Sequence, residues 1–293
     1  MEVGVNFNGD RSFEEIKKGV KLSERMGYSN VWVGESIHFS HPFPVIAAIT
    51  HATERIRVGS GIISYFFNRS LHIKKAFETL METYGDRFAV TLAPGDVNSL
   101  RQAGLDASHP LERLERAVAD LRSSKALENT PLYVGASGPR MIEAAGRIAD
   151  GVLLNYAHPV YVEWALNHLE RKAYVGVYAP ALLVPDRLNE KAVLMAAAFV
   201  AAGSNPEFQE QFNLRGEVDE VRRILNEKRY DDLWMKRDFL LDRFAIHGDI
   251  EKISERLNEF KKMGVDQVIL GSPFTYNHKA INDIGRIVSQ EGF

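Results

Sequence analysis

A parallel α/β barrel is the fold that this sequence predicts, and three observations lead to it. Short runs of β-branched and apolar residues alternate with segments of helical period about eight times along the chain. No Ser-, Gly- or Pro-rich linker, charge block or short repeat divides its 293 residues. The turn after the first run, Asn8-Gly9-Asp10, lacks the Gly-x-Gly-x-x-Gly pattern that an open doubly wound sheet would carry there. We therefore expect an α/β protein with a (β/α)8 TIM barrel.

Each strand and helix of this barrel has its own signal in the sequence. Ser12, with Glu14 and Glu15 in the next turn, begins the first helix, and Gly27 ends it. The predicted strands are Val3–Phe7, Asn30–Val33, Ile56–Ile63, Phe88–Leu92, Leu132–Val134, Gly151–Asn155, Tyr174–Leu183 and Gln267–Leu270. The predicted helices are residues 12–26, 44–53, 71–84, 111–127, 139–148, 160–172 and 249–263, with one more at the end of the chain. We expect a single domain over residues 1–293, with a helical excursion at about 188–242.

Composition narrows the classes of function. The chain has no cysteine, which excludes disulfides, thiolate catalysis and iron–sulfur clusters. A net charge of -3 gives no electrostatic reason to expect nucleic acid or an anionic membrane as a partner. The first residues do not resemble a secretory signal, and the most apolar stretch, residues 192–202, is too short to span a bilayer. We expect a cytoplasmic protein that acts on a small molecule.

In a barrel of this kind, function is found at the carboxyl ends of the strands. The residues at these ends are mostly glycines and small polar residues, with two carboxylates, Glu35 and Asp96. They include neither a nucleophile beside a partner base nor the spacing of a metal site. Asp96 has a structural alternative as the N-cap of the following segment.

The most informative segment is residues 133–141, Tyr-Val-Gly-Ala-Ser-Gly-Pro-Arg-Met. A strand here leads into a glycine-rich turn, and Pro139 occupies the first position of a helix. Unpaired N–H groups at a helix N-terminus attract phosphate, and glycines let the anion come close to the backbone. The alternative is an ordinary strand-to-helix turn. A second segment, Val58-Gly-Ser-Gly-Ile-Ile63, predicts either a bulge beside something flat or a tight packing bend.

These segments, in this order, resemble the bacterial-luciferase-like superfamily, and most closely its F420-dependent methylenetetrahydromethanopterin reductases. The similarity runs through residues 3–7, 59–62, 87–96, 135–141, 143–155 and 244–273. It implies a non-prolyl cis peptide at Gly61–Ile62, forming a bulge behind a deazaflavin ring, with Asn6 and Ser60 also on the cofactor side. It further implies that the cofactor phosphate binds the turn formed by Gly135, Ala136, Ser137, Gly138, Pro139 and Arg140, assisted by the backbone of Leu154 and Asn155. Asp96 would then lie near the reacting centre.

The chain departs from this family on the substrate side. Asn6 stands where the reductases typically carry a glutamate, and an amide cannot act as a general acid. Gly34-Glu35-Ser36 stands in place of Thr-Asp-His, and most of the segment between the fourth helix and the fifth strand is missing.

The resemblance implies an oxidoreductase that transfers hydride between reduced coenzyme F420 and a small electrophile of the CH–NH or CH–OH type. Asp96 or Glu35 would move a proton or stabilise positive charge. Two alternatives remain open, an FMN-dependent monooxygenase and a non-catalytic flavin-binding relative. Dimers are common in this superfamily, so we expect a homodimer or higher homo-oligomer, to which the apolar helix at 189–202 could contribute.

Overall fold

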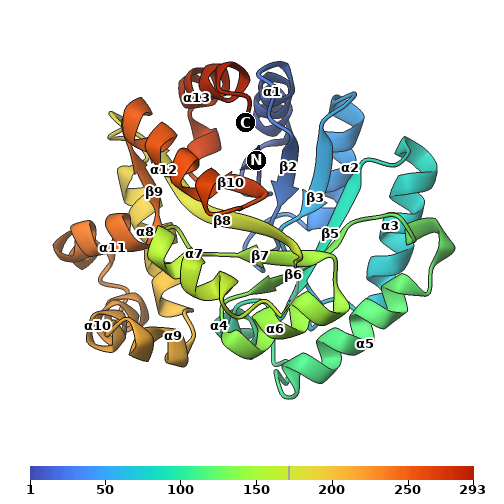
Figure 1. Cartoon of the computed structure of the whole chain (residues 1–293), viewed down its shortest axis with the longest axis horizontal. Coiled ribbons are helices and arrows are strands. Elements are labelled where there is room, and N and C mark those ends of the chain that lie inside the picture. Colours follow the sequence, from blue (N-terminus) through green and yellow to red (C-terminus); the bar gives the residue numbers. More distant parts are fainter. Residues whose placement is uncertain (171) are drawn as a thin grey trace.

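The computed structural model describes residues 1–170 and 172–293 and shows a closed parallel barrel surrounded by helices (Figure 1). β10 pairs with both β1 and β8 and so closes the ring. The eight barrel positions are filled by β1 (Glu2–Asn6), β2 (Asn30–Val33), β3 (Arg57–Ser60) with β4 (Ile63–Ser64), β5 (Phe88–Ala93), β6 (Leu132–Ala136), β7 (Gly151–Leu154), β8 (Tyr174–Leu183) and β10 (Gln267–Gly271). The predicted (β/α)8 TIM barrel is confirmed.

Helices cover the outside of this barrel. They are α1 (Phe13–Arg25), α2 (Pro42–Ala52), α3 (Ser70–Tyr84), α4 (Val97–Gln102), α5 (Pro110–Arg122), α6 (Pro139–Ile148), α7 (Pro159–Leu166), α12 (Ile250–Lys262) and α13 (His278–Gln290). The helical excursion between β8 and the short strand β9 (Ile246–Gly248) contains α8 (Glu190–Ala202), α9 (Pro206–Gln211), α10 (Arg215–Asn226) and α11 (Arg237–Phe244). Three 3-10 turns complete the chain, η1 (Lys125–Leu127), η2 (Tyr230–Lys236) and η3 (Phe274–Tyr276).

The structure differs from the predicted elements in several places. The helix predicted over 111–127 ends at Arg122, and the 3-10 turn η1 follows it. The single strand predicted over residues 56–63 is divided into β3 and β4, because the chain bulges at residues 61 and 62. The short elements α4 and β9 were not predicted, since six and three residues are too few to show a period. The helix predicted over 160–172 ends at Leu166, and Arg171 in that span lies outside the described residues.

The interior of the barrel is filled by large side chains opposite glycines. Trp32, Ala89, Tyr133, Leu153 and Ile269 form one buried cluster inside the ring. A Cβ on Gly59 would lie 2.6 Å from the Trp32 indole, so the absence of a side chain in β3 makes room for the ring from β2. Such layered filling makes the barrel a packed core rather than a pore.

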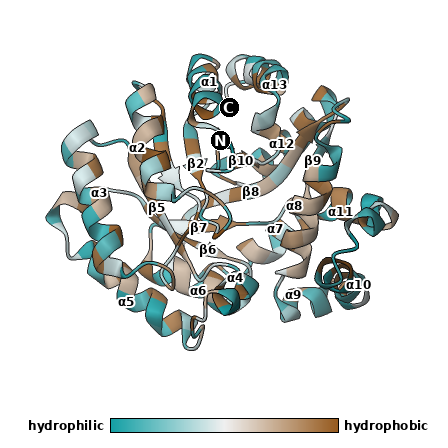
Figure 2. Ribbon diagram, turned by 180° about the vertical axis from the view of Figure 1, so that it is seen from behind, coloured by the Kyte–Doolittle hydropathy of each residue, from teal (hydrophilic) through white to brown (hydrophobic). Residues whose placement is uncertain are grey.

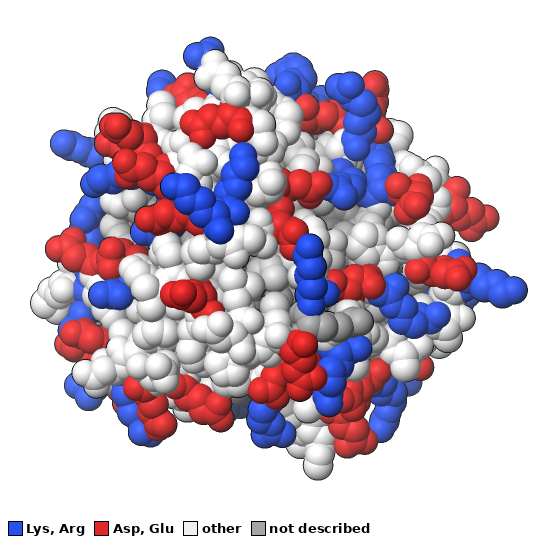
Figure 3. All heavy atoms as spheres, in the orientation of Figure 1, with Lys and Arg blue, Asp and Glu red and all other residues white. Residues whose placement is uncertain are grey.

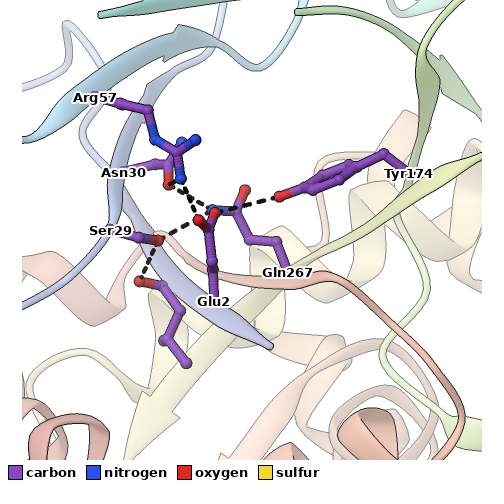
Figure 4. A network of polar contacts seen from close by, with 7 residues as sticks. Glu2, Ser29, Asn30, Arg57, Tyr174 and Gln267 are labelled. Atoms are coloured by element: carbon purple, nitrogen blue, oxygen red, sulfur yellow. Dashed lines mark hydrogen bonds and ion pairs between the residues drawn. The ribbon is translucent and has the colours of Figure 1, made fainter. Parts of the chain in front are cut away.

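The amino ends of the strands are closed by a polar network (Figure 4). The Glu2 carboxylate forms an ion pair with Arg57 and accepts hydrogen bonds from the Tyr174 hydroxyl at 3.4 Å and the Gln267 amide at 3.3 Å. The Gln267 amide also donates to the Ser29 hydroxyl at 3.2 Å. These side chains are hydrogen-bonded mainly to one another, although the buried Gln267 Oε1 has no partner among the described residues. The strand ends on the other side of the barrel are where function is expected.

The surrounding helices turn apolar faces inward (Figure 2). The apolar stretch at 192–202, in α8, is largely explained by burial inside its own chain, because Val193, Leu194, Ala197, Ala198 and Ala201 are all buried. Phe199 is the large apolar side chain of α8 that stays exposed. The expected homodimer therefore stays a prediction, with less support from this helix than its sequence indicates.

Charged side chains of both signs are interspersed over the face shown in Figure 3, and no large region there carries one sign. This agrees with a formal net charge of -3 for the whole chain. Within residues 1–170 and 172–293, none of the helices combines the length and the apolarity needed to cross a bilayer.

Candidate active site at the carboxyl ends of the strands

The bulge in the third barrel strand is the first feature of the site. The peptide bond between Gly61 and Ile62 is cis, which confirms the prediction for this bond. The Gly61 N–H donates to the Val33 carbonyl at 2.8 Å, and the Ile62 carbonyl accepts from the Glu35 N–H at 3.2 Å. These hydrogen bonds attach the bulge to the end of β2. Ile62 stays half-buried, so part of its side chain faces the barrel mouth.

The Ser60 side chain forms hydrogen bonds where the bulge interrupts the pairing of the third barrel strand with β5. β3 pairs with β5 at Gly59, and β4 resumes the pairing at Ile63. Between these points the fully buried Ser60 hydroxyl accepts from the Thr91 N–H at 2.9 Å and donates to the Thr91 carbonyl at 3.3 Å. The hydroxyl that we expected on the cofactor side is therefore used inside the sheet.

The Glu35 carboxylate holds the other side of the bulge in place by hydrogen bonds. Its carboxylate accepts hydrogen bonds from the Ser64 N–H and from the Asn68 amide, each at 2.7 Å and each on a different oxygen. The Ser64 hydroxyl in turn donates to the Pro94 carbonyl at 2.5 Å, which connects the segment to the end of β5. Glu35 thus lies at the mouth as predicted, but both of its oxygens already hold the chain in place.

The glycine-rich turn lies directly beside this bulge. A Cβ on Gly135 would lie 2.8 Å from the Ile62 Cγ2 and 3.1 Å from the Ala93 Cβ. Gly135 must therefore be a glycine for β6 to approach the bulged strand so closely. Two segments about seventy residues apart in the sequence, each predicted to contact one end of a cofactor, are neighbours at the mouth.

The turn opens into a cavity of about 570 Å³, a volume within the range of small-molecule sites. Its walls are Pro94 and residues 135–141, with His109–Glu112 and Glu115 of α5 on one side and Asn205 and Glu207 of α9 on the other. The N-cap of α6 is Gly138, which provides no side-chain cap. The first residue, Pro139, has no N–H, and the Met141 N–H donates to the Gly138 carbonyl at 3.1 Å. The Arg140 N–H, at a position without a partner within the helix, is therefore the donor of the first turn that is available to an anion.

Charges around the cavity have both signs. Arg140 is exposed at the start of α6 and forms no ion pair with any residue in the described part of the chain. On the opposite wall, Glu112 pairs with Arg116 at 2.8 Å, and Glu115 pairs with Arg147 at 3.5 Å. Arg140 is thus the cation that remains free to meet an anionic group at this turn.

The strand next to the turn supports it from behind. Leu154 of β7 pairs with Ala136 of β6 and is fully buried. The Asn155 Oδ1 is buried and has no hydrogen-bond partner among the described residues. The Tyr156 hydroxyl donates to the Ser137 carbonyl and fixes the turn, and burial raises the pKa of this tyrosine. Sequence reasoning missed Tyr156, because only the folded chain brings its hydroxyl to residue 137.

Asn6 lies fully buried at the end of β1, on the opposite side of the mouth. Its amide donates to the Asn8 side chain and to the Trp32 carbonyl, both at 2.9 Å, and accepts from the Ser272 hydroxyl at 3.0 Å. The Asn8 Oδ1 continues the chain of hydrogen bonds by accepting from the Gly34 N–H at 3.1 Å. An uncharged, hydrogen-bonded amide therefore occupies the position where the resemblance leads one to expect a glutamate.

Asp96 lies at the end of β5 and caps α4. Its Oδ2 accepts from the Ser99 N–H at 2.7 Å, which confirms the structural alternative for this residue. The side chain is exposed, and its Oδ1 forms no hydrogen bond with the described residues. Capping and chemistry can therefore use different oxygens of the same carboxylate.

A cluster that sequence reasoning missed lies beyond Asn6. The Tyr276 hydroxyl donates to Asp10, whose second oxygen is buried without a hydrogen-bond partner among the described residues. Burial, with the hydrogen bond to Asp10, raises the pKa of Tyr276 to about 12. Burial and the nearby Tyr276 and Asp10 also raise the pKa of Tyr178, which packs against the interior cluster from β8. Asp10 and Tyr276 follow strand ends, but nothing in their spacing signals that they meet.

The barrel and its mouth together define a TIM-barrel protein with a small-molecule cavity between a bulged strand and a helix N-terminus. A family model described as Luciferase-like monooxygenase matches residues 1–124 and 116–267. The chain belongs to this luciferase-like monooxygenase family.

Two further comparisons describe what the chain is similar to. It is 28% identical to the 5,10-methylenetetrahydromethanopterin reductase of Archaeoglobus fulgidus, over 98% of this chain and 98% of that protein. The alignment spans 325 positions, more than the 293 residues of this chain, so that reductase carries segments that are missing here. Among solved structures, the coenzyme F420 dependent tetrahydromethanopterin reductase of Methanopyrus kandleri matches with a TM-score of 0.85 at 22% identity, over 99% of both chains. An F420-dependent secondary alcohol dehydrogenase, solved with an F420–acetone adduct, matches with a TM-score of 0.74 at 16% identity, over 99% of both chains.

Proposed function

We propose that this chain is an F420-dependent oxidoreductase that transfers hydride between reduced F420 and a small electrophile, an iminium or a carbonyl compound. The observation that carries this proposal is the contact between the glycine-rich turn and the bulge. An uncapped helix N-terminus for a phosphate, which opens into the cavity, follows a strand whose Gly135 lies against Ile62, a half-buried apolar surface for a planar ring. The full-length relatives named above support the same class of cofactor.

The residues present fit such a cofactor. Backbone N–H groups at the start of α6 and the free Arg140 would bind the phosphate, and Ile62 would support one face of the ring. The buried Asn155 Oδ1, which lacks a partner among the described residues, offers one acceptor at the end of β7. When bound, the reduced deazaflavin supplies the hydride, and the protein supplies orientation and electrostatics.

The carboxylates have separate tasks in this proposal. Glu35 holds the bulge through its two hydrogen bonds and, while ionised, contributes a negative charge beside the ring. The exposed Asp96 Oδ1 forms no hydrogen bond with the described residues and is free to stabilise positive charge on an iminium substrate or to move a proton. The buried amide of Asn6 orients Asn8 and Ser272 and takes no part in proton transfer.

Titration of the purified chain with F420 and with FMN tests the proposal, with binding followed by fluorescence. We expect F420 to bind in the micromolar range and to be turned over with an iminium or a carbonyl substrate. Binding of neither cofactor below about 1 mM, which corresponds to about 4 kcal/mol, contradicts the proposal.

An FMN-dependent monooxygenase is the second candidate, because the α6 turn would bind a phosphate, which FMN and F420 share. Oxygen uptake with reduced FMN and an organic substrate, together with tighter binding of FMN than of F420, would establish it. Tight binding of either cofactor without any turnover would instead identify a non-catalytic relative.

A further inference from the structure

Asn205, from the helical excursion, lies at the same cavity as the glycine-rich turn, although about seventy residues separate them in the sequence. It is the N-cap of α9, and its Oδ1 accepts a hydrogen bond from the Glu207 N–H at 2.9 Å. This hydrogen bond fixes which end of the amide is the oxygen. The Nδ2 must therefore point the other way, toward α6.

The contact with Gly138 shows where the Nδ2 lies. A Cβ on Gly138 would be 2.4 Å from the Asn205 Nδ2. Gly138 has a φ of −133°, an extended conformation that any residue can adopt. Its lack of a side chain is therefore explained by the approach of this amide and not by the backbone. The Asn205 amide lies against the N-cap of the helix that we assign to the phosphate.

An aromatic cluster that contains Phe208 of α9 fixes the position of Asn205. Phe208 of α9 is fully buried and stacks on Tyr156, with ring centroids 4.7 Å apart and an interplanar angle of 17°. Tyr156 is the residue whose hydroxyl holds the Ser137 carbonyl of the turn. The Gln209 amide adds a hydrogen bond to the Ser204 carbonyl at 2.6 Å. α9 and the turn are thus docked on the same side chain.

We propose that the Asn205 side-chain amide donates a hydrogen bond to the anionic group bound at the start of α6, a phosphate in the proposed cofactor. Among the described residues the Nδ2 forms no hydrogen bond, so both of its N–H groups are available to a ligand in the cavity. The excursion thereby supplies a second binding residue, beside Arg140, at the same cavity. This inference rests on the proposed function, because it needs a phosphate-bearing ligand.

The test compares F420 with the ribityl deazaflavin that lacks its phosphate-linked tail, here called the riboside. Both are titrated into the wild-type chain, two variants at Asn205 and one control variant. Asn205→Asp and Asn205→Ser both keep a side-chain oxygen that can cap α9, so the fold is preserved. Asn205→Asp replaces the donor by an anion, and Asn205→Ser removes the reach of the donor. Asn226→Asp, at an exposed position in α10, adds the same charge away from the cavity.

We expect Asn205→Asp to weaken F420 binding by about 10- to 100-fold and Asn205→Ser by about 10-fold, as for the loss of a hydrogen bond to a charged group. The riboside should bind all four proteins within about twofold, and Asn226→Asp should bind F420 as the wild type does. If an Asn205 variant loses the same affinity for both ligands, or binds F420 as tightly as the wild type does, the inference is overturned and the proposed function still stands. A wild-type chain that binds neither ligand overturns the proposed function, and this inference with it.

Discussion

The Asp96 Oδ2 caps α4, and we propose that its exposed Oδ1 takes part in the chemistry. We expect Asp96→Asn to keep the cap and the melting temperature, because asparagine caps helices as well as aspartate does. Turnover should fall by roughly 100-fold or more, as for the loss of a general acid or base. Asp96→Ala serves as the comparison, since it also loses the cap at a cost of about 1 kcal/mol. Unchanged turnover in Asp96→Asn would leave this residue with a structural role alone.

For Glu35, in contrast to Asp96, we expect a substitution to change the stability of the fold. Removing its carboxylate in Glu35→Ala leaves the buried Ser64 N–H without a partner, which should cost about 1–3 kcal/mol of unfolding free energy. Glu35→Gln should lose less, because the amide oxygen of the variant can still accept from the Ser64 N–H, while the Asn68 amide keeps its hydrogen bond to the Ser64 carbonyl at 3.2 Å. Urea denaturation of both variants measures the difference. Loss of turnover in a fully stable Glu35→Gln would show that the charge acts in the chemistry as well.

At the scale of elements, the approach of β6 to the bulge predicts the effect of Gly135→Ala. The new methyl group would meet the Ile62 side chain, so we expect a loss of about 1–3 kcal/mol in unfolding free energy and weaker cofactor binding. Gly216→Ala in α10 is the matched control, because nothing lies within 4 Å of its added Cβ. That variant should be stabilised by about 0.4–1 kcal/mol. Equal stability of the two variants would contradict the close contact between β6 and the bulge.

α7 predicts a dependence of stability on pH. The neutral His158 ring caps this helix by accepting from the Val160 N–H at 3.3 Å. Burial, with the charges of Arg256 and Arg243, lowers the pKa of His158, so the unfolded chain binds its proton more readily than the folded chain. The stability that this residue contributes is therefore complete above about pH 6.5 and is lost as the pH falls below that value.

Urea midpoints at pH 7.5 and 5.5 measure this loss, with His158→Asn as the variant that keeps the cap without a titrating ring. The wild type should lose more stability than the variant over this range. A smaller loss remains in the variant, because burial also lowers the pKa of His247. An identical loss in the two proteins would exclude His158 as the cause.

Local signals in the sequence predict the elements that have them. The Tyr174–Leu183 strand and the Pro139–Ile148 helix have the predicted bounds, since a long apolar run and a Gly-Pro start define them locally. The glycines of the turn were informative for the same reason. Contacts made between distant segments had no such signal. Asn205 shows only the Asn-Pro pattern of a helix start, and the sequence does not reveal that this helix begins against Gly138.

For the whole molecule, the barrel brings the end of β2, the bulge, the end of β5 and the α6 turn to one edge, and the excursion adds α9 to it. The half of this edge that we propose for the cofactor is predictable from the sequence, because glycines, a proline and a resemblance mark it. The substrate half is not, since Asn6, Asp10 and Tyr276 depend on how the β1 and β10 ends pack. We expect the substrate to be recognised on that side.

Tyr276→Phe tests this expectation on the substrate side. The variant removes the hydroxyl that donates to Asp10 and leaves the turn and the bulge untouched. We expect KM for the electrophilic substrate to rise or turnover to fall by about 10-fold, with the affinity for F420 unchanged within about twofold. An equal loss in F420 affinity would place this cluster on the cofactor side instead.

A crystal structure of the chain with F420 bound is the most direct test of the claim that the α6 turn and the neighbouring bulge hold the two ends of the cofactor. We expect the phosphate within hydrogen-bond distance of the backbone N–H groups of Gly138 and Arg140, and one face of the ring against Ile62. A phosphate bound elsewhere, with the ring away from the Gly61–Ile62 bulge, would contradict it.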